Sequence, residues 1–194
     1  IMQPSFGVPA PKTPLVTITL DKQYVPVKRQ NRTLAYKTAY FGTVYTGFPK
    51  QQNFTVVFDT GSGHFFLPSS TCNSESCRQH TRYDRALSSS AVDIDHDGNP
   101  VDPTVAERDQ VEIAFGTGGV IGDFVYETVC LASIATLADE LSPSCTQVRL
   151  ILATELSEDP FKAFKFDGVL GLGLDGLALE PEFSFFRQMT TLNP

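Results

Sequence analysis

The chain has 194 residues, of which 41% are hydrophobic and 19% are charged. This composition is typical of a single folded domain and unlike that of a disordered chain. Fifteen Lys and Arg against 22 Asp and Glu give a formal net charge of −7, which argues against nucleic acid as a partner. No apolar run reaches the roughly 18 residues that cross a membrane as a helix, so the sequence shows no membrane anchor.

Short β-branched or aromatic runs, separated by Gly, Pro, Asn and Asp, follow one another along most of the chain, as in β proteins. In chain order we expect strands at Leu15–Leu20, Tyr40–Tyr45, Phe54–Phe58, Val111–Phe115, Val120–Tyr126 and Val148–Leu152. A short amphipathic helix is expected at Glu182–Met189, and Ala132–Leu141 is a second candidate helix. In the first of these, apolar side chains recur at three-residue spacing, at Phe183, Phe186 and Met189. The sequence therefore predicts an all-β fold with a few short helices.

Two segments are expected to be flexible: Ile1–Pro14, which contains four prolines, and the acidic stretch Ser88–Arg108. The acidic stretch begins like an EF-hand calcium loop, with the run Asp93-Ile94-Asp95-His96-Asp97-Gly98. The twelfth position of such a loop should be a bidentate Glu, but here it is Thr104. We therefore expect a solvated acidic loop and no metal site.

The four cysteines form two locally close pairs, Cys72 with Cys77 and Cys130 with Cys145. Neither pair has the two-residue gap of a zinc knuckle, and the three histidines are not placed to complete a zinc site. We expect two disulfides, the alternative being buried free thiols. Asn-x-Thr sequons make Asn31 and Asn53 candidate glycosylation sites, and together with the cysteines they favour a protein of the secretory pathway.

The stretch Phe54–Pro68, FTVVFDTGSGHFFLP, is the most informative part of the sequence. An apolar strand leads directly to Asp59, which opens a turn of small residues, Thr60-Gly61-Ser62-Gly63. A loop held by a rigid strand suits catalysis, because it presents the carboxylate to a cleft while main-chain N–H groups and the Ser62 hydroxyl donate to it. The alternative is a structural Asp that closes an Asx turn.

This stretch resembles the active-site loop of pepsin-like aspartic proteases, in which Asp-Thr-Gly-Ser is followed by an aromatic-hydrophobic-Pro segment such as Phe65–Pro68. Further matches follow in the family's order: Tyr40–Val44 resembles the strand that enters the first lobe, and Cys72-x₄-Cys77 its small disulfide loop. Ile113–Val129 resembles the flap hairpin, and Phe166–Leu174 the element behind the catalytic loop. The resemblance covers about residues 38 to 190.

The resemblance implies an all-β lobe of bent sheets or a partial barrel with a flap hairpin. Residues 38–194 would be the N-terminal lobe of an aspartic endopeptidase, and a C-terminal lobe of the same protein, absent from this chain, would supply the second Asp. Residues 1–37 would be an extension, either a strand of the mature enzyme, with Lys28-Arg29 in a loop, or a propeptide remnant.

In such an enzyme Asp59 is one of two carboxylates that hold the attacking water. Thr60 braces the pair, Ser62 bonds the carboxylate, and Gly61 permits the tight turn. Phe115, Gly116, Thr117, Gly118 and Phe66 would bind the peptide substrate, and no cofactor or metal is implied.

Three positions depart from the family's pattern. Phe115 stands where the flap usually has Tyr, and Phe66 where Trp is common, so a polar link between these two residues cannot form. His64 replaces a frequent Asn, and we expect it to be an exposed loop residue.

Two functions remain open at this point: an aspartic endopeptidase, and a catalytically silent homologue that binds peptides or inhibitors. The second is supported by Phe115 and by the single Asp-Thr-Gly in the chain. A retroviral-type homodimer is disfavoured, because protomers of that kind are much shorter and lack the disulfides.

Overall fold

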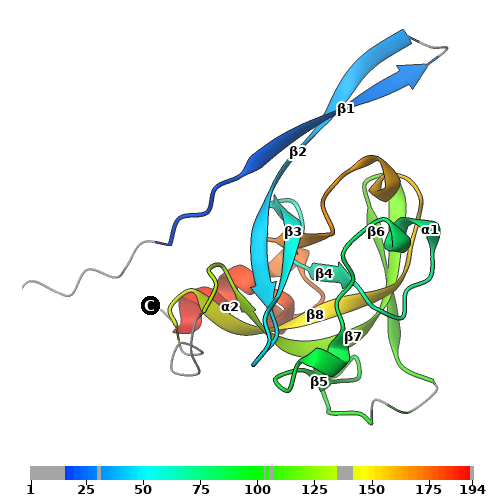
Figure 1. The fold of residues 1–194 in the computed structure, drawn as a ribbon. Helices are drawn as coiled ribbons and strands as arrows, with labels where there is room; N and C mark the ends of the chain where they lie inside the picture. Colours follow the sequence, from blue (N-terminus) through cyan, green and yellow to red (C-terminus); the bar gives the residue numbers. More distant parts are fainter. Residues whose placement is uncertain (1–15, 30–31, 103, 105–106, 135–141, 193–194) are drawn as a thin grey trace, which may run out of the picture.

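The computed structural model describes residues 16–29, 32–102, 104, 107–134 and 142–192. Among these residues nine strands form one mixed sheet: β1 (Asp21–Arg29), β2 (Arg32–Thr46), β3 (Gln52–Asp59), β4 (Phe65–Pro68), β5 (Val92–Asp93), β6 (Gln110–Phe115), β7 (Gly118–Cys130), β8 (Cys145–Leu156) and β9 (Gly168–Gly171). The helices of the described residues are short: α1 (Glu75–Arg78), α2 (Phe185–Leu192) and the 3₁₀ turns η1 (Arg85–Leu87), η3 (Phe161–Ala163), η4 (Asp175–Leu177) and η5 (Pro181–Phe183). The expected all-β fold is confirmed (Figure 1).

The sheet closes on itself into a partial barrel. Its strand order is β1-β2-β3-β9-β4-β8-β7-β5, with β6 added as a hairpin on β7. A further antiparallel pairing joins β2 to β7 through Tyr45↔Cys130 and Thr46↔Val129. This pairing links the two sides of the strongly bent sheet, so the strands between β2 and β7 enclose a core.

The three central strands, β3, β9 and β4, are brought together by small residues. β9 runs parallel to β3 and antiparallel to β4. A Cβ atom on Gly168 would lie 2.2 Å from the Phe66 carbonyl oxygen, so only glycine permits this approach. All residues of β4 and β9 are buried, which explains their uninterrupted apolar sequences.

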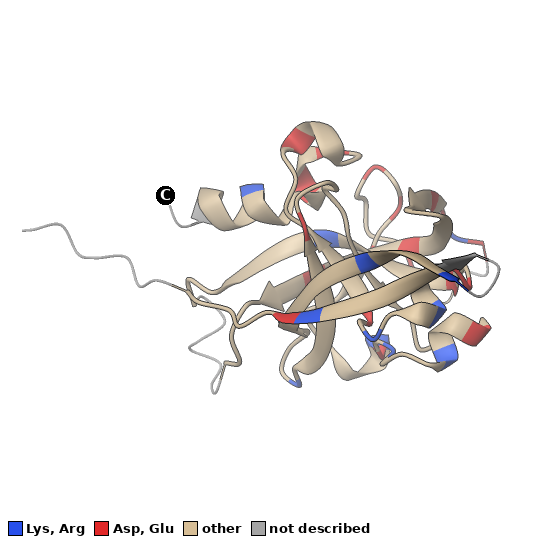
Figure 2. Cartoon of the chain, turned by 90° about the horizontal axis from the view of Figure 1, so that it is seen from above, with Lys and Arg blue, Asp and Glu red and all other residues tan. Residues whose placement is uncertain are grey.

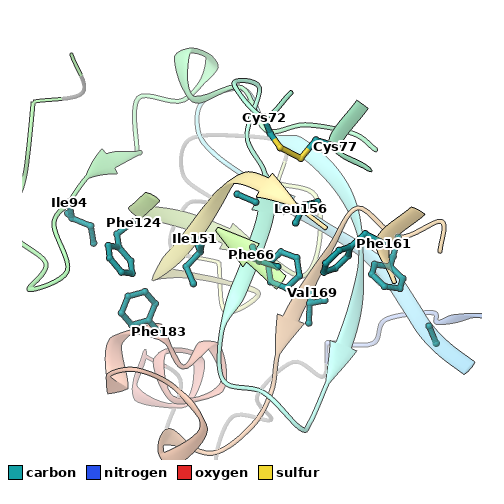
Figure 3. Packing of buried hydrophobic residues seen from close by; sticks show 14 residues of the cluster. Phe66, Cys72, Cys77, Ile94, Phe124, Ile151, Leu156, Phe161, Val169 and Phe183 are labelled. Carbon is teal, nitrogen blue, oxygen red and sulfur yellow. A yellow bond between two sulfur atoms is a disulfide. The ribbon is translucent and has the colours of Figure 1, made fainter. Parts of the chain in front are cut away.

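The core lies on the two faces of these strands. On one face Phe66 and Val169 pack with Phe161 and Leu156, and the disulfide Cys72–Cys77 borders them (Figure 3). On the other face are Phe65, Leu67 and Leu170, together with residues of β2, β3, β7 and β8. Alternate residues of one strand thus serve different clusters, as the two-residue period of a strand requires.

Both expected disulfides are present. Cys72–Cys77 ties α1 to the loop that precedes it. Cys130–Cys145 joins the end of β7 to the start of β8, where the two cysteines are directly paired in the ladder. Of the candidate helix Ala132–Leu141, which follows Cys130, residues 135–141 lie outside the described part of the chain, and the residues from 132 to 134 are not helical.

The first strand lies later than the sequence suggested. Residues 16–20 of the expected strand Leu15–Leu20 are not in a strand, and β1 begins at Asp21. The preceding segment crosses over Gly42 instead of pairing beside it, since a Cβ on Gly42 would lie 3.0 Å from both the Leu20 side chain and the Thr19 carbonyl. Lys28 and Arg29, expected in a loop, are the last residues of β1.

β1 and β2 form a long hairpin that projects from the body (Figure 1). On its exposed surface the Tyr24 and Tyr36 rings meet edge to face at 6.3 Å, and the Lys22 ammonium lies 4.6 Å from the Tyr24 ring. Gln23 ties the hairpin to the body, donating to the Ala163 carbonyl and accepting from the Lys165 N–H. The segment Ile1–Pro14 and the sequon residue Asn31 lie outside the described residues.

The C-terminal helix buries a different face from the expected one. The segment around Glu182 forms η5, and α2 begins only at Phe185. Phe185 is therefore buried beside Met189 at the i, i+4 spacing, while the Phe186 side chain is 51% exposed. The three-residue spacing failed because it ran across the end of one helical segment and the start of another.

The acidic stretch Ser88–Arg108 is not simply solvated. Asp93 is buried, with Arg85 Nε 2.8 Å from its Oδ2 and Arg108 Nη1 2.5 Å from its Oδ1. Two guanidinium groups thus neutralise Asp93, the first acidic residue of the calcium-like run. Arg85 is 8 positions from Asp93 in the sequence and Arg108 is 15 positions from it, so no local motif reveals the pairing.

In the ribbon of the described residues, the positions of Lys and Arg are interspersed with those of Asp and Glu (Figure 2). Within the part of the chain that the structure describes, no helix has the length and apolarity needed to span a membrane.

Candidate active site

Asp59 is the last residue of β3 and opens a tight turn. Its Oδ1 accepts a hydrogen bond of 2.9 Å from the Gly61 N–H, which is the bond of an Asx turn. Its carbonyl accepts from the Leu172 N–H at 2.7 Å, so the segment after β9 holds the main chain in place. The carboxylate is only partly buried and faces a cavity. The structural and the functional interpretation of this residue are therefore compatible.

The neighbours of Asp59 differ in their surroundings. Thr60 is exposed. The Ser62 hydroxyl is buried and has no hydrogen-bond partner among the described residues, so the expected bond to the Asp59 carboxylate is not formed in this structure.

Glycines let the end of β9 and the segment after it lie directly against the Asp59 loop. Gly171 donates to the His64 carbonyl at 2.9 Å, and Gly173 donates to the Ser62 carbonyl at 2.8 Å. A Cβ on Gly171 would lie 2.6 Å from both the His64 nitrogen and the Ser62 oxygen. The pattern Gly-Val-Leu-Gly-Leu-Gly is thus explained by main chain packed on main chain.

His64 is not the exposed loop residue expected from the sequence. Its Nε2 accepts a hydrogen bond of 2.9 Å from the Leu179 N–H, and its ring meets Phe183 edge to face at 5.9 Å. Burial lowers the pKa of His64, because the charged imidazolium loses hydration. The neutral ring therefore serves as an acceptor that fixes the segment before η5.

The hairpin of β6 and β7 lies over the site. Phe115 pairs with Gly118, so the turn consists of Gly116 and Thr117, and Gly116 has a φ of 60°. Two-residue hairpin turns need such left-handed backbone, which glycine adopts without strain. The flap expected from the sequence is therefore a tight hairpin with its tip at 116–117.

Three aromatic rings connect the hairpin to the core below it. The Phe115 ring lies 5.8 Å from Phe66, edge to face, and is stacked on Phe161 at 5.7 Å. Phe66 is fully buried and also meets Phe161 edge to face. The two departures from the family's pattern, Phe115 and Phe66, thus contact each other, so an apolar contact stands in for a polar link.

A cavity of about 410 Å³ lies between Asp59, the flap and β2. The lining includes three of the expected substrate-binding residues, Phe115, Gly116 and Thr117, whereas Phe66 is in the layer beneath and Gly118 is not part of the wall. Residues that the sequence analysis missed complete the lining: Lys37, Thr38, Ala39, Tyr40, Val57, Phe58, Pro160, Phe164 and Phe166. Phe164 and Phe166 lie just before Asp167-Gly168 at the start of the Gly-rich segment. Their position beside that segment is the local sequence signal that could have marked them as residues of the site.

Residues 39–193 match the family model described as eukaryotic aspartyl protease. The chain therefore belongs to that family. It is 37% identical over 150 residues to chymosin of Callithrix jacchus, an alignment covering 77% of this chain and 33% of that protein. It is also 32% identical over 173 residues to pepsin A of Gallus gallus (89% of this chain, 39% of that protein). With cathepsin E of Cavia porcellus the identity is 31% over 157 residues (79% of this chain, 34% of that protein). The chain thus spans between a third and two-fifths of the length of these relatives.

Proposed function

We propose that this chain is the N-terminal catalytic lobe, residues 38–194, of an aspartic endopeptidase. The observation that carries the proposal is the position of Asp59, a partly buried carboxylate at the end of a strand, in the wall of a cavity beneath a hairpin. Family membership supports the same chemistry, since the relatives are named chymosin, pepsin A and cathepsin E.

In the proposed mechanism Asp59 shares a proton with a second Asp and holds a water between them. Two carboxylates so close cannot both ionise, so one remains protonated. The ionised carboxylate takes a proton from the water as the water attacks the peptide carbonyl, and the protonated one donates to the carbonyl oxygen. The main-chain N–H of Gly61 donates to Oδ1 and so fixes the orientation of the Asp59 carboxylate.

The second Asp would come from a C-terminal lobe. This chain contains Asp-Thr-Gly once, and the relatives are more than twice as long as the part of them that the chain matches. Thr60, which is exposed beside Asp59, would brace the two lobes against each other. The Ser62 hydroxyl would turn to the Asp59 carboxylate once the pair is assembled.

The substrate would be a peptide bound in an extended conformation under the flap, as an added strand. Gly116 and Thr117 would supply main-chain hydrogen bonds, while closure of the hairpin excludes water. Phe115, with Phe66 behind it, would cover the side chain next to the cleaved bond. Its contribution is apolar, since it has no hydroxyl.

We also assign the protein to the secretory pathway. Both disulfides of the chain are formed, which suits an oxidising compartment, and the sequon residue Asn53 is exposed on β3. In this proposal the extension up to residue 37 belongs to the mature enzyme, because Gln23 on β1 ties it to the body of the lobe.

One further function is supported by Phe115 and the single Asp-Thr-Gly: a silent homologue that binds peptides or inhibitors. Incubation of the full-length protein with a peptide library at acidic pH distinguishes the two. An endopeptidase cleaves peptides and is blocked by a statine-type inhibitor, whose hydroxyl replaces the bound water. A silent homologue binds the inhibitor and leaves every peptide intact.

A further inference from the structure

The tip of the flap is held from outside the hairpin by the loop that follows β8. The Gly119 N–H donates to the Ser157 hydroxyl at 3.0 Å, and the Ser157 N–H donates to the Gly119 carbonyl at 3.1 Å. A Cβ on Gly118 would lie 2.0 Å from the Asp159 carbonyl oxygen. The hairpin and this loop therefore lie in main-chain contact (Figure 1).

Asp159 adds a side-chain link at the tip itself. The Thr117 hydroxyl donates to one oxygen of the Asp159 carboxylate. The other carboxylate oxygen lies 3.7 Å from the Lys37 ammonium on β2. Thr117 and Lys37 line the cavity from two different elements, so the Asp159 carboxylate connects the flap to the opposite rim of the cavity.

The loop that carries Asp159 is itself firmly anchored. The Ser157 carbonyl accepts from the Ser76 hydroxyl at 2.8 Å, beside the Cys72–Cys77 disulfide. Phe161 is buried between Phe66 and Phe115, and its carbonyl lies 3.1 Å from His80 Nε2. A link made to this loop therefore restrains the flap against the rigid body of the lobe.

We propose that Asp159 is a positioning residue that holds the flap tip over the Asp59 cavity through Thr117. This inference rests on the proposed function for its effect on peptides, and on the structure alone for its effect on the flap. A flap restrained near its closed position loses less freedom when a peptide binds, so the link lowers KM. It touches no reacting atom, so kcat changes little.

The test uses the full-length protein with Thr117→Val, Asp159→Ala and the double variant. Valine keeps the shape of threonine and removes the donor. Each single variant should raise KM roughly three- to tenfold, the effect of one typical hydrogen bond, with kcat within about twofold. The double variant should raise KM no further, because both changes break one link. Thr117→Ser should recover most of the lost affinity relative to Thr117→Val.

The matched control is Asp175→Asn, which breaks an exposed ion pair with Arg187 away from the cavity. It should leave KM unchanged. Amide hydrogen exchange at residues 116–119 provides a readout that needs no catalysis: exchange should be faster in Thr117→Val and Asp159→Ala and unchanged in Asp175→Asn.

The outcomes separate this inference from the proposed function. Unchanged flap exchange in both variants, additive effects in the double variant, or a loss of kcat at constant KM overturns the role of Asp159. If the wild-type protein cleaves no peptide while the exchange is faster as expected, the proposed function fails and the link stands.

Discussion

Replacing Gly171 by Ala tests whether the Asp59 loop is positioned by main chain packed on main chain. The new Cβ would lie 2.6 Å from the His64 nitrogen and 2.6 Å from the Ser62 oxygen. Neither atom can rotate away, so β9 and the loop must separate, and the bond from Gly171 to the His64 carbonyl stretches. Such overpacking costs about 1–3 kcal/mol, and weakening the hydrogen bond adds about 1 kcal/mol.

The loss is offset in part because Ala restricts the unfolded chain, a gain of about 0.4–1 kcal/mol. We therefore expect Gly171→Ala to lower the free energy of unfolding by about 1–3 kcal/mol, measured by urea denaturation of the full-length protein. Asp59 is paired with Gly171 in the ladder, so kcat/KM should fall as well, by up to about a hundredfold for a displacement of 1 Å.

Gly176→Ala is the matched control, since a Cβ there meets nothing within 4 Å. It should leave the free energy of unfolding unchanged or raise it slightly, with normal kcat/KM. If Gly171→Ala is as stable and as active as Gly176→Ala, the end of β9 does not position the loop, and this explanation of the Gly-rich pattern is wrong.

Two further predictions concern the flap and His64. Phe115→Ala removes a ring packed on Phe66 and Phe161. Since burying such a ring contributes roughly 1.5–3 kcal/mol, kcat/KM should fall about tenfold to a hundredfold, while Phe115→Tyr should change kcat/KM little. An unchanged kcat/KM in Phe115→Ala would show that the flap does not close over substrate. His64 should titrate below the ordinary pKa of about 6.5 in an NMR titration, because burial disfavours its charged form. As the pH falls, the unfolded state binds the proton first, at the ordinary pKa. The stability that neutral His64 contributes is therefore present above the ordinary pKa and is lost as the pH falls from there towards the lowered pKa of the folded state. A measured pKa at or above the ordinary value would contradict the role of His64 as a buried acceptor.

Local patterns in the sequence were enough for the elements whose partners are near in the chain. The strand that ends at Asp59 and the disulfides Cys72–Cys77 and Cys130–Cys145 are of this kind. So is the hairpin with Gly116 at its tip, because the alternation on either side and the turn residue lie within a few positions.

What the sequence did not predict depends on contacts between distant segments. Asp93 was expected in solvent because its arginine partners carry no local signature. The half-buried position of His64 depends on Leu179, 115 residues away. Lys37 and Phe164 reach the cavity only because β2 and the loop before β9 converge there. The start of β1 was misplaced because the crossing over Gly42 competes with strand pairing.

The measurement that tests the central proposal most directly is peptide cleavage by the Asp59→Asn variant of the full-length protein at acidic pH. The amide has the shape of the carboxylate and still accepts from Gly61, so the turn should fold normally. It cannot take the proton of the attacking water, so turnover should be abolished. A statine-type inhibitor should block peptide cleavage by the wild-type protein. Asp175→Asn, the same substitution in an exposed ion pair, should cleave at the wild-type rate. Normal turnover in Asp59→Asn would remove this residue from the mechanism and contradict the proposed function.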